Sequence, residues 1–151
     1  MSTKQMSNVN DMVTYTNSFF NSIHKTSHRS IVLLIELGII AAIISFASAH
    51  NATAVGILFI AGIGILMNVF TIESYNRDYA EFQKLCNSFA DKYANSRTMD
   101  ITTSSDVVAS INAIRSASES YMTKYKIVSV VNTATIMVVA ILVCLIVTAA
   151  I

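Results

Sequence analysis

Residues 31–40, "IVLLIELGII", form an apolar run interrupted by one carboxylate, Glu36. The run belongs to a longer apolar stretch, residues 31–72, which a short polar break divides into two segments. A bilayer core about 30 Å thick requires about 20 consecutive apolar residues per helix. The stretch therefore predicts two transmembrane helices, 31–50 and 52–72, joined by a tight turn.

A third apolar segment, residues 127–151, contains no charged side chain and predicts a third transmembrane helix. The composition agrees, because 13% of the 151 residues are charged, about half the usual share in a soluble domain. The first apolar segment begins after residue 30 and is longer than the apolar part of a cleavable signal peptide. We therefore expect it to remain in the protein as a membrane span.

The basic residues indicate an orientation in the membrane. With three crossings, all ten fall on one side: Lys4, Lys25, Arg29, Arg77, Lys84, Lys92, Arg97, Arg115, Lys124 and Lys126. The positive-inside rule then places the N-terminus and residues 73–126 in the cytoplasm and the C-terminus outside. We expect an integral membrane protein of a bacterial inner membrane or of a viral or host membrane.

The cytoplasmic part also carries a helical pattern. Apolar residues recur there at steps of three and four, which marks one face of a helix, with Arg77, Asp78 and Glu81 expected elsewhere around it. The apolar stripes are Tyr75, Tyr79, Phe82, Cys86, Phe89 and Tyr93, and then Val107, Ile111, Ile114, Ser118, Tyr121 and Tyr125. A weaker stripe runs from Val9 to Ile23, and the polar residues 96–105 predict the tip of a helical hairpin.

These patterns predict an all-α protein with three long helices, at about 8–50, 52–97 and 104–151. The expected segments are an amphipathic N-terminal helix (1–30), a transmembrane hairpin (31–72), a cytoplasmic helical hairpin (73–126) and a third transmembrane helix (127–151). The chain has no proline, so nothing forces a helix to stop between the spans and their flanks. We expect a three-span bundle that continues into the cytoplasm as a coiled-coil-like stalk.

Two asparagines fall on the bundle-facing side when the stripes are extended into the spans by the same steps. Asn68 and Asn132 both lie four or five residues inside the expected cytoplasmic boundary, as does Glu36. We expect the three to form one intramembrane polar layer. The layer is either a proton or cation site, or a set of interhelical hydrogen bonds with Glu36 neutralised by protonation or by Arg29 or Lys126.

The direction of Glu36 indicates an oligomer. At 100° per residue, Glu36 lies well off the apolar stripe that ends at Ile23. Either the first helix bends near residues 28–30, or Glu36 faces a second subunit. A carboxylate turned towards lipid costs at least about 2.5–3.5 kcal/mol. We therefore expect a homo-oligomer in the lipid bilayer.

Other motifs indicate neither a cofactor nor a metal. His24 and His28 have the spacing of a metal pair but no third ligand at a matching spacing, so a basic cluster facing lipid headgroups is the better interpretation. Cys86 and Cys144 lie in different environments and are not expected to pair. The chain has no glycine-rich phosphate loop and no His-Glu-x-x-His motif, and we expect no enzyme. The mixed charges beside the aromatic stripe argue against nucleic acid.

The layout of spans and stalk resembles that of small pore-forming membrane proteins such as holins and the membrane effectors of defence systems. This resemblance implies a small oligomeric protein that forms or gates an ion-conducting or membrane-permeabilising pore. The alternative is a non-conducting structural or accessory membrane protein whose cytoplasmic stalk recruits a protein partner or assembles a complex. The two hypotheses differ in the role that they give to the polar layer.

Overall fold

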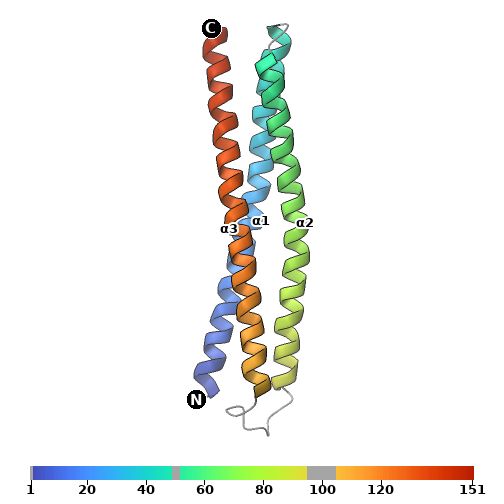
Figure 1. The fold of residues 1–151 in the computed structure, drawn as a ribbon, viewed down its shortest axis with the longest axis vertical. Helices are drawn as coiled ribbons and strands as arrows, with labels where there is room; N and C mark the ends of the chain where they lie inside the picture. Colours follow the sequence, from blue (N-terminus) through green and yellow to red (C-terminus); the bar gives the residue numbers. More distant parts are fainter. Residues whose placement is uncertain (1, 49–51, 95–104) are drawn as a thin grey trace. The chain divides into compact units, whose positions relative to one another are not determined.

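The chain folds as three consecutive α-helices. They are α1 (Ser2–Ala47), α2 (Ala52–Ala94) and α3 (Ser105–Ala150) (Figure 1). The computed structural model describes residues 2–48, 52–94 and 105–151, and the side chains among them of residues 9–48, 52–92 and 105–151. Each helix contains a segment long and apolar enough to cross a membrane. The predicted all-α class with three long helices that are able to span a bilayer is confirmed.

The helix ends differ from the predicted ones at the N-terminus. α1 begins at Ser2, six residues before the predicted start at residue 8. No proline or glycine occurs in residues 2–8, so the helix extends beyond the first residue of its apolar stripe. The predicted ends at residues 50, 97 and 104, and most of the expected hairpin tip, lie outside the described residues.

The helices divide into two compact units. Unit 1 comprises residues 1–22 and 74–125, and unit 2 comprises residues 23–73 and 126–151. Each unit therefore takes a part of every helix. In α1 the division falls between residues 22 and 23, eight residues before the expected start of the first span.

Unit 1 is packed around the side chain of Phe20, which is 0% exposed. Five aromatic rings have centroids 5.4–6.1 Å from that of Phe20: Tyr75, Tyr79, Phe82, Tyr121 and Tyr125. The contacts bring α1 against both α2 and α3. Aromatic rings prefer edge-to-face or offset arrangements to a face-to-face sandwich. All five pairs are edge-to-face or tilted.

The hydrophobic core cluster of unit 2 is aliphatic. Its buried members are Leu34, Ala41, Ala54, Ile57, Ala61, Val139, Val143 and Ile146. The buried residues of α2 in this unit continue as Gly64, Asn68 and Thr71, so that burial recurs at alternating steps of three and four. This is the spacing at which helices pack nearly parallel or antiparallel in bundles.

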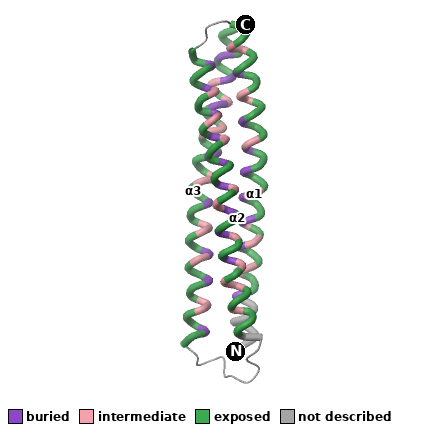
Figure 2. The backbone as a smooth tube through the Cα atoms, turned by 90° about the vertical axis from the view of Figure 1, so that its right-hand side faces the viewer, coloured by how far each residue is buried: buried purple, intermediate pink, exposed green. Residues whose placement is uncertain are grey.

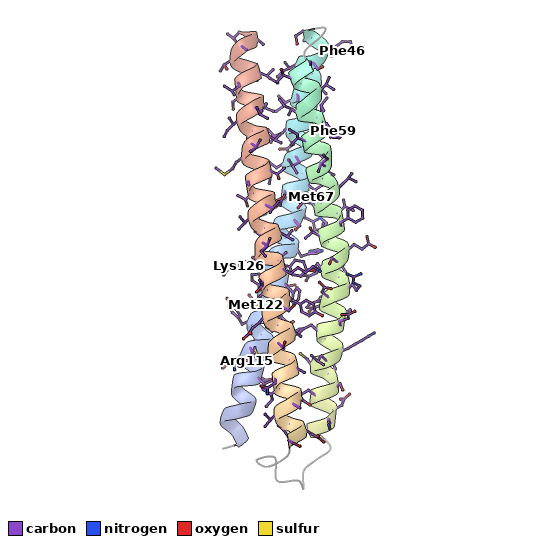
Figure 3. The ribbon with its side chains drawn as sticks, viewed as in Figure 1. Phe46, Phe59, Met67, Arg115, Met122 and Lys126 are labelled. Atoms are coloured by element: carbon purple, nitrogen blue, oxygen red, sulfur yellow. The ribbon has the colours of Figure 1, made fainter. Side chains whose placement is uncertain are left out.

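Many residues along all three helices are exposed (Figure 2), and in unit 2 a large share of the exposed side chains is apolar. Apart from Tyr15 and Val108, every large hydrophobic side chain that is exposed in the described residues belongs to this unit. Phe46 is 92% exposed and Phe59 is 71% exposed, and both are labelled with Met67 in Figure 3. Exposed apolar side chains in such number mark a membrane or protein interaction site.

Candidate functional site

The two asparagines predicted in the polar layer contact each other inside unit 2. Asn68 on α2 is 2% exposed and Asn132 on α3 is 8% exposed. The Asn68 Nδ2 donates one hydrogen bond of 2.9 Å to Asn132 Oδ1 and another of 2.8 Å to the carbonyl oxygen of Gly64. The extended stripes therefore placed both residues on facing sides of their helices.

The helices approach closely one turn away from this pair. A methyl group on Gly64 would lie 3.0 Å from Leu34 Cδ1 of α1 and 3.2 Å from Thr135 Cγ2 of α3. Glycine is thus favoured here by the contact, because Leu34 and Thr135 would have to shift by a few tenths of an ångström to admit a methyl group. The side chains of Leu34 and Thr135 fill the space beside Gly64, so the asparagine pair lies next to a tightly packed layer of the three helices.

Glu36 does not join the asparagines. It is exposed on α1, and its neighbours on the same side of the helix, Val32 and Ile39, are each 55% exposed. Glu36 follows the buried Leu34 by two residues, which turns it about 200° away from the core. The structure therefore brings Asn68 and Asn132 together but leaves Glu36 outside the polar layer expected for the three residues.

Serines occupy the place on α1 that was expected for Glu36. Counted from the Leu34–Gly64 contact, the α1 residue at the level of Asn68 is Ser30, which is buried, as is Ser27 one turn earlier. The Ser30 hydroxyl donates a 2.9 Å hydrogen bond to the carbonyl oxygen of Thr26. Continuing the N-terminal stripe beyond Ile23 by steps of four and three would have identified both serines.

The aromatic stripes lie inside unit 1. Tyr75, Phe82, Ile114 and Tyr125 are buried, and Tyr79, Phe89, Ile111 and Tyr121 are half-buried. The side chain of Tyr93 lies outside the described residues. Burial raises the pKa values of Tyr75 and Tyr125, and also that of the Cys86 thiol. These side chains pack within unit 1, with the three helices contributing to one another's burial.

A buried carboxylate in unit 1 was missed by the sequence analysis. Asp78, expected on the charged side of α2, is 5% exposed. Its Oδ2 accepts hydrogen bonds of 2.7 Å from Lys124 Nζ and 2.8 Å from Tyr125 Oη. Lys124 also donates to Ser74 Oγ at 2.7 Å. The signal was present, because Asp78 lies three residues after Tyr75 and four before the buried Phe82.

A second buried polar contact in unit 1 joins α1 to α3. The hydroxyl oxygens of Thr16 and Ser118 lie 2.7 Å apart, and Thr16 also donates to the carbonyl oxygen of Met12 at 2.8 Å. Both side chains are buried. A buried hydroxyl needs a partner to offset its lost hydration, and here two hydroxyls supply each other with one.

The histidines and cysteines form no larger group. The rings of His24 and His28 pack edge to face, with centroids 4.6 Å apart. Within residues 2–48, 52–94 and 105–151, no three His, Cys, Asp or Glu side chains are grouped closely enough to hold a metal ion. Cys86 is half-buried and Cys144 is exposed, and both are free thiols.

Comparison of the chain with protein-family models, with curated proteins and with solved structures found no match. The function therefore has to be argued from the burial and contacts of the chain's own residues. Two features carry that argument: the exposed Glu36 within the apolar surface of unit 2, and the buried polar contacts that join the helices.

Proposed function

We propose that this chain is a three-span membrane protein that assembles with copies of itself and forms or gates an ion-conducting path between them. The observation that carries the proposal is the exposure of Glu36 among apolar residues. A path between subunits needs polar groups on the outside of each three-helix unit, and Glu36 is such a group.

Membrane insertion is supported by the surface of unit 2. Unit 2 carries nearly all of the large aliphatic and aromatic side chains that are exposed in the described residues, and burying such side chains away from water is favourable. Its helices are long enough to cross the hydrocarbon. The distribution of lysine and arginine supports an orientation with the N-terminus and residues 73–126 in the cytoplasm. Unit 1, which carries most of the charged residues, would then lie outside the hydrocarbon on the cytoplasmic side.

Oligomerisation is supported by the cost of leaving Glu36 in lipid. An ionisable side chain inside a bilayer costs at least about 2.5–3.5 kcal/mol unless it finds a polar partner or water. No hydrogen bond or ion pair joins Glu36 to another described residue of its own chain. A neighbouring copy supplies either a partner for the carboxylate or a hydrated gap beside it. Either arrangement places Glu36 at a subunit interface.

The proposal is tested by ion flux in liposomes. We expect purified wild-type protein to carry protons or monovalent cations across the bilayer, and Glu36→Gln to reduce the flux at least tenfold. Glu73→Gln is the matched control, because it makes the same chemical change at an exposed carboxylate at the end of unit 2. Equal flux through wild type and Glu36→Gln would contradict a role for this carboxylate in conduction.

A non-conducting scaffold is the second candidate, and the Asn68–Asn132 hydrogen bond favours it. The pair satisfies itself within one chain and lies beside a packed layer, as expected of a contact that holds helices together. Vesicles that stay sealed, although the protein in them is inserted and helical, would support the scaffold and exclude the pore. The exposed charges of unit 1 would then be the place to seek a partner.

A further inference from the structure

Most of the described cations of unit 1 have an acidic partner, whereas those of unit 2 have none. In unit 1, Lys124 and Arg77 pair with Asp78, Lys92 pairs with Asp106, and Arg115 pairs with Glu119. The exposed Lys84 is the exception among the described cations of unit 1, since it makes no ion pair or side-chain hydrogen bond with a described residue. In unit 2, the exposed Lys25, Arg29 and Lys126 make no ion pair or side-chain hydrogen bond with any described residue. Unit 2 therefore presents three positive charges that form no ion pair with the described residues.

These charges lie at one end of unit 2. Leu34, Gly64 and Thr135 meet in one layer. Lys25 on α1, Glu73 on α2 and Lys126 on α3 each lie nine residues from that layer. All three lie on the side of the layer towards residues 23, 73 and 126, where unit 2 ends. Nine residues correspond to about 13 Å of helix.

The end is asymmetric in charge. α1 contributes Lys25 and, one turn later, Arg29, and α3 contributes Lys126. α2 contributes the carboxylate of Glu73. Three cations against one anion leave this end positive. Lys126 is labelled on α3 in Figure 3.

The charged end borders the apolar surface directly. Ile127 follows Lys126 and is 61% exposed, and Val32 on α1 follows Arg29 within one turn. Long basic side chains at such a border extend their charged groups to the membrane surface while their methylene stems cover apolar residues. At the surface of a membrane, the anions available to such side chains are the phosphates of lipid headgroups.

We propose that Lys25, Arg29 and Lys126 form a binding surface for the headgroup phosphates of anionic phospholipids. The inference rests on the proposed membrane insertion and adds a class of lipid to it. Each lysine or arginine near an anionic membrane surface contributes about fivefold in association. The three together give a preference for anionic over zwitterionic lipid that falls with salt.

The test uses the full chain reconstituted in phosphatidylcholine and probed with spin-labelled lipids. The ratio of association constants of labelled phosphatidylglycerol and labelled phosphatidylcholine is measured from the motionally restricted spectral component. We expect a ratio of at least three for wild type at low salt, and a ratio of about one for the triple variant Lys25→Gln, Arg29→Gln, Lys126→Gln.

Two further variants separate the surface from general effects of charge. The triple variant Lys84→Gln, Lys92→Gln, Arg115→Gln removes the same charge from unit 1 and is expected to keep the wild-type ratio. Lys25→Arg with Lys126→Arg is also expected to keep it, because the positive charges remain. Loss of selectivity in the unit 1 variant, or a wild-type ratio of one, would overturn the inference.

The outcomes distinguish this inference from the proposed function. If neither labelled lipid shows a restricted component, the protein has no lipid-facing surface and membrane insertion itself fails. If both show it equally, insertion stands and the anionic preference is wrong. Selectivity that inorganic phosphate abolishes more effectively than chloride, at the same ionic strength, would overturn the lipid assignment in favour of soluble phosphate.

Discussion

The hydrogen bond between Tyr125 and Asp78 is the contact whose removal we expect to be most informative about unit 1. Tyr125 is 0% exposed, and its Oη donates to Asp78 Oδ2 at 2.8 Å. Tyr125→Phe deletes this bond and retains the ring that packs against Phe20 at a centroid distance of 5.6 Å. The effect of the variant therefore reports the hydrogen bond and not a cavity.

The expected loss follows from the surroundings of the bond. A hydrogen bond to a charged group contributes about 1.5–3 kcal/mol. Lys124 continues to donate to the same carboxylate oxygen at 2.7 Å, so Asp78 is not left without a partner. We therefore expect Tyr125→Phe to cost about 1.5–2 kcal/mol, in the lower part of that range.

The assay is hydrogen exchange of the solubilised full chain, followed by mass spectrometry on peptides from residues 74–90 and 115–126. A loss of about 1.5–2 kcal/mol accelerates exchange through local opening by about 10- to 30-fold, because each 1.4 kcal/mol is a factor of about ten. Exchange resolves the two units separately, whereas a single unfolding temperature would mix them.

Tyr121→Phe is the matched control for this experiment. It removes the same hydroxyl from the same aromatic cluster, but the Tyr121 Oη donates to Glu81 Oε2 at 3.3 Å in an exposed position. We expect a cost below about 0.5 kcal/mol, since exposed charged contacts contribute little. Equal acceleration in the two variants would refute the reasoning that burial of Asp78 makes its hydrogen bonds strong.

Three further predictions concern both units. Asn68→Leu should lower stability in lipid by about 1–2 kcal/mol, measured by reversible unfolding in mixed micelles, and adding Asn132→Leu should recover part of the loss because no amide then lacks its partner. Gly64→Ala should cost about 1–3 kcal/mol in the same assay, since its Cβ would lie 3.0 Å from a leucine methyl, whereas Gly56→Ala, with open space around it, should be neutral or stabilising. Alkaline pH should destabilise unit 1: the folded-state pKa of Tyr125 is raised, chiefly by burial, so the stability that this group contributes is complete below its ordinary pKa near 10 and is lost above it. A phenolate absorbance titration should show Tyr125 losing its proton at a higher pH in the folded wild-type protein than in the unfolded chain. A Tyr125 titration at the same pH in both states would contradict this prediction.

Much of the architecture followed from local pattern. The apolar runs and the absence of proline predicted three long helices, because both features act within a few residues of one chain segment. The steps of three and four placed Tyr75, Phe82 and Ile114 on inward sides, and the same steps carried the pattern to Asn68 and Asn132. These inferences needed helical geometry alone.

The site could be predicted less well than the helices. Asp78 was expected on the charged side of α2 because of its residue type, although its spacing from Tyr75 and Phe82 is that of an inward position. Glu36 was expected beside the asparagines because of its distance from a boundary along the chain. In both cases, residue type or depth was given more weight than the direction of the side chain.

The sequence by itself determined where helices form and which side of each helix is apolar, since both depend on residues one or two turns apart. The tertiary structure decided which polar groups meet. Asp78 is buried because α3 presents Lys124 and Tyr125 to it. Glu36 is exposed because α1 packs with Leu34 against Gly64, which turns Glu36 outward and leaves Ser30 at the level of Asn68. A buried polar group is stable only where a facing helix supplies its hydrogen-bond partner, and that pairing depends on how the helices are aligned along one another, which no single segment encodes.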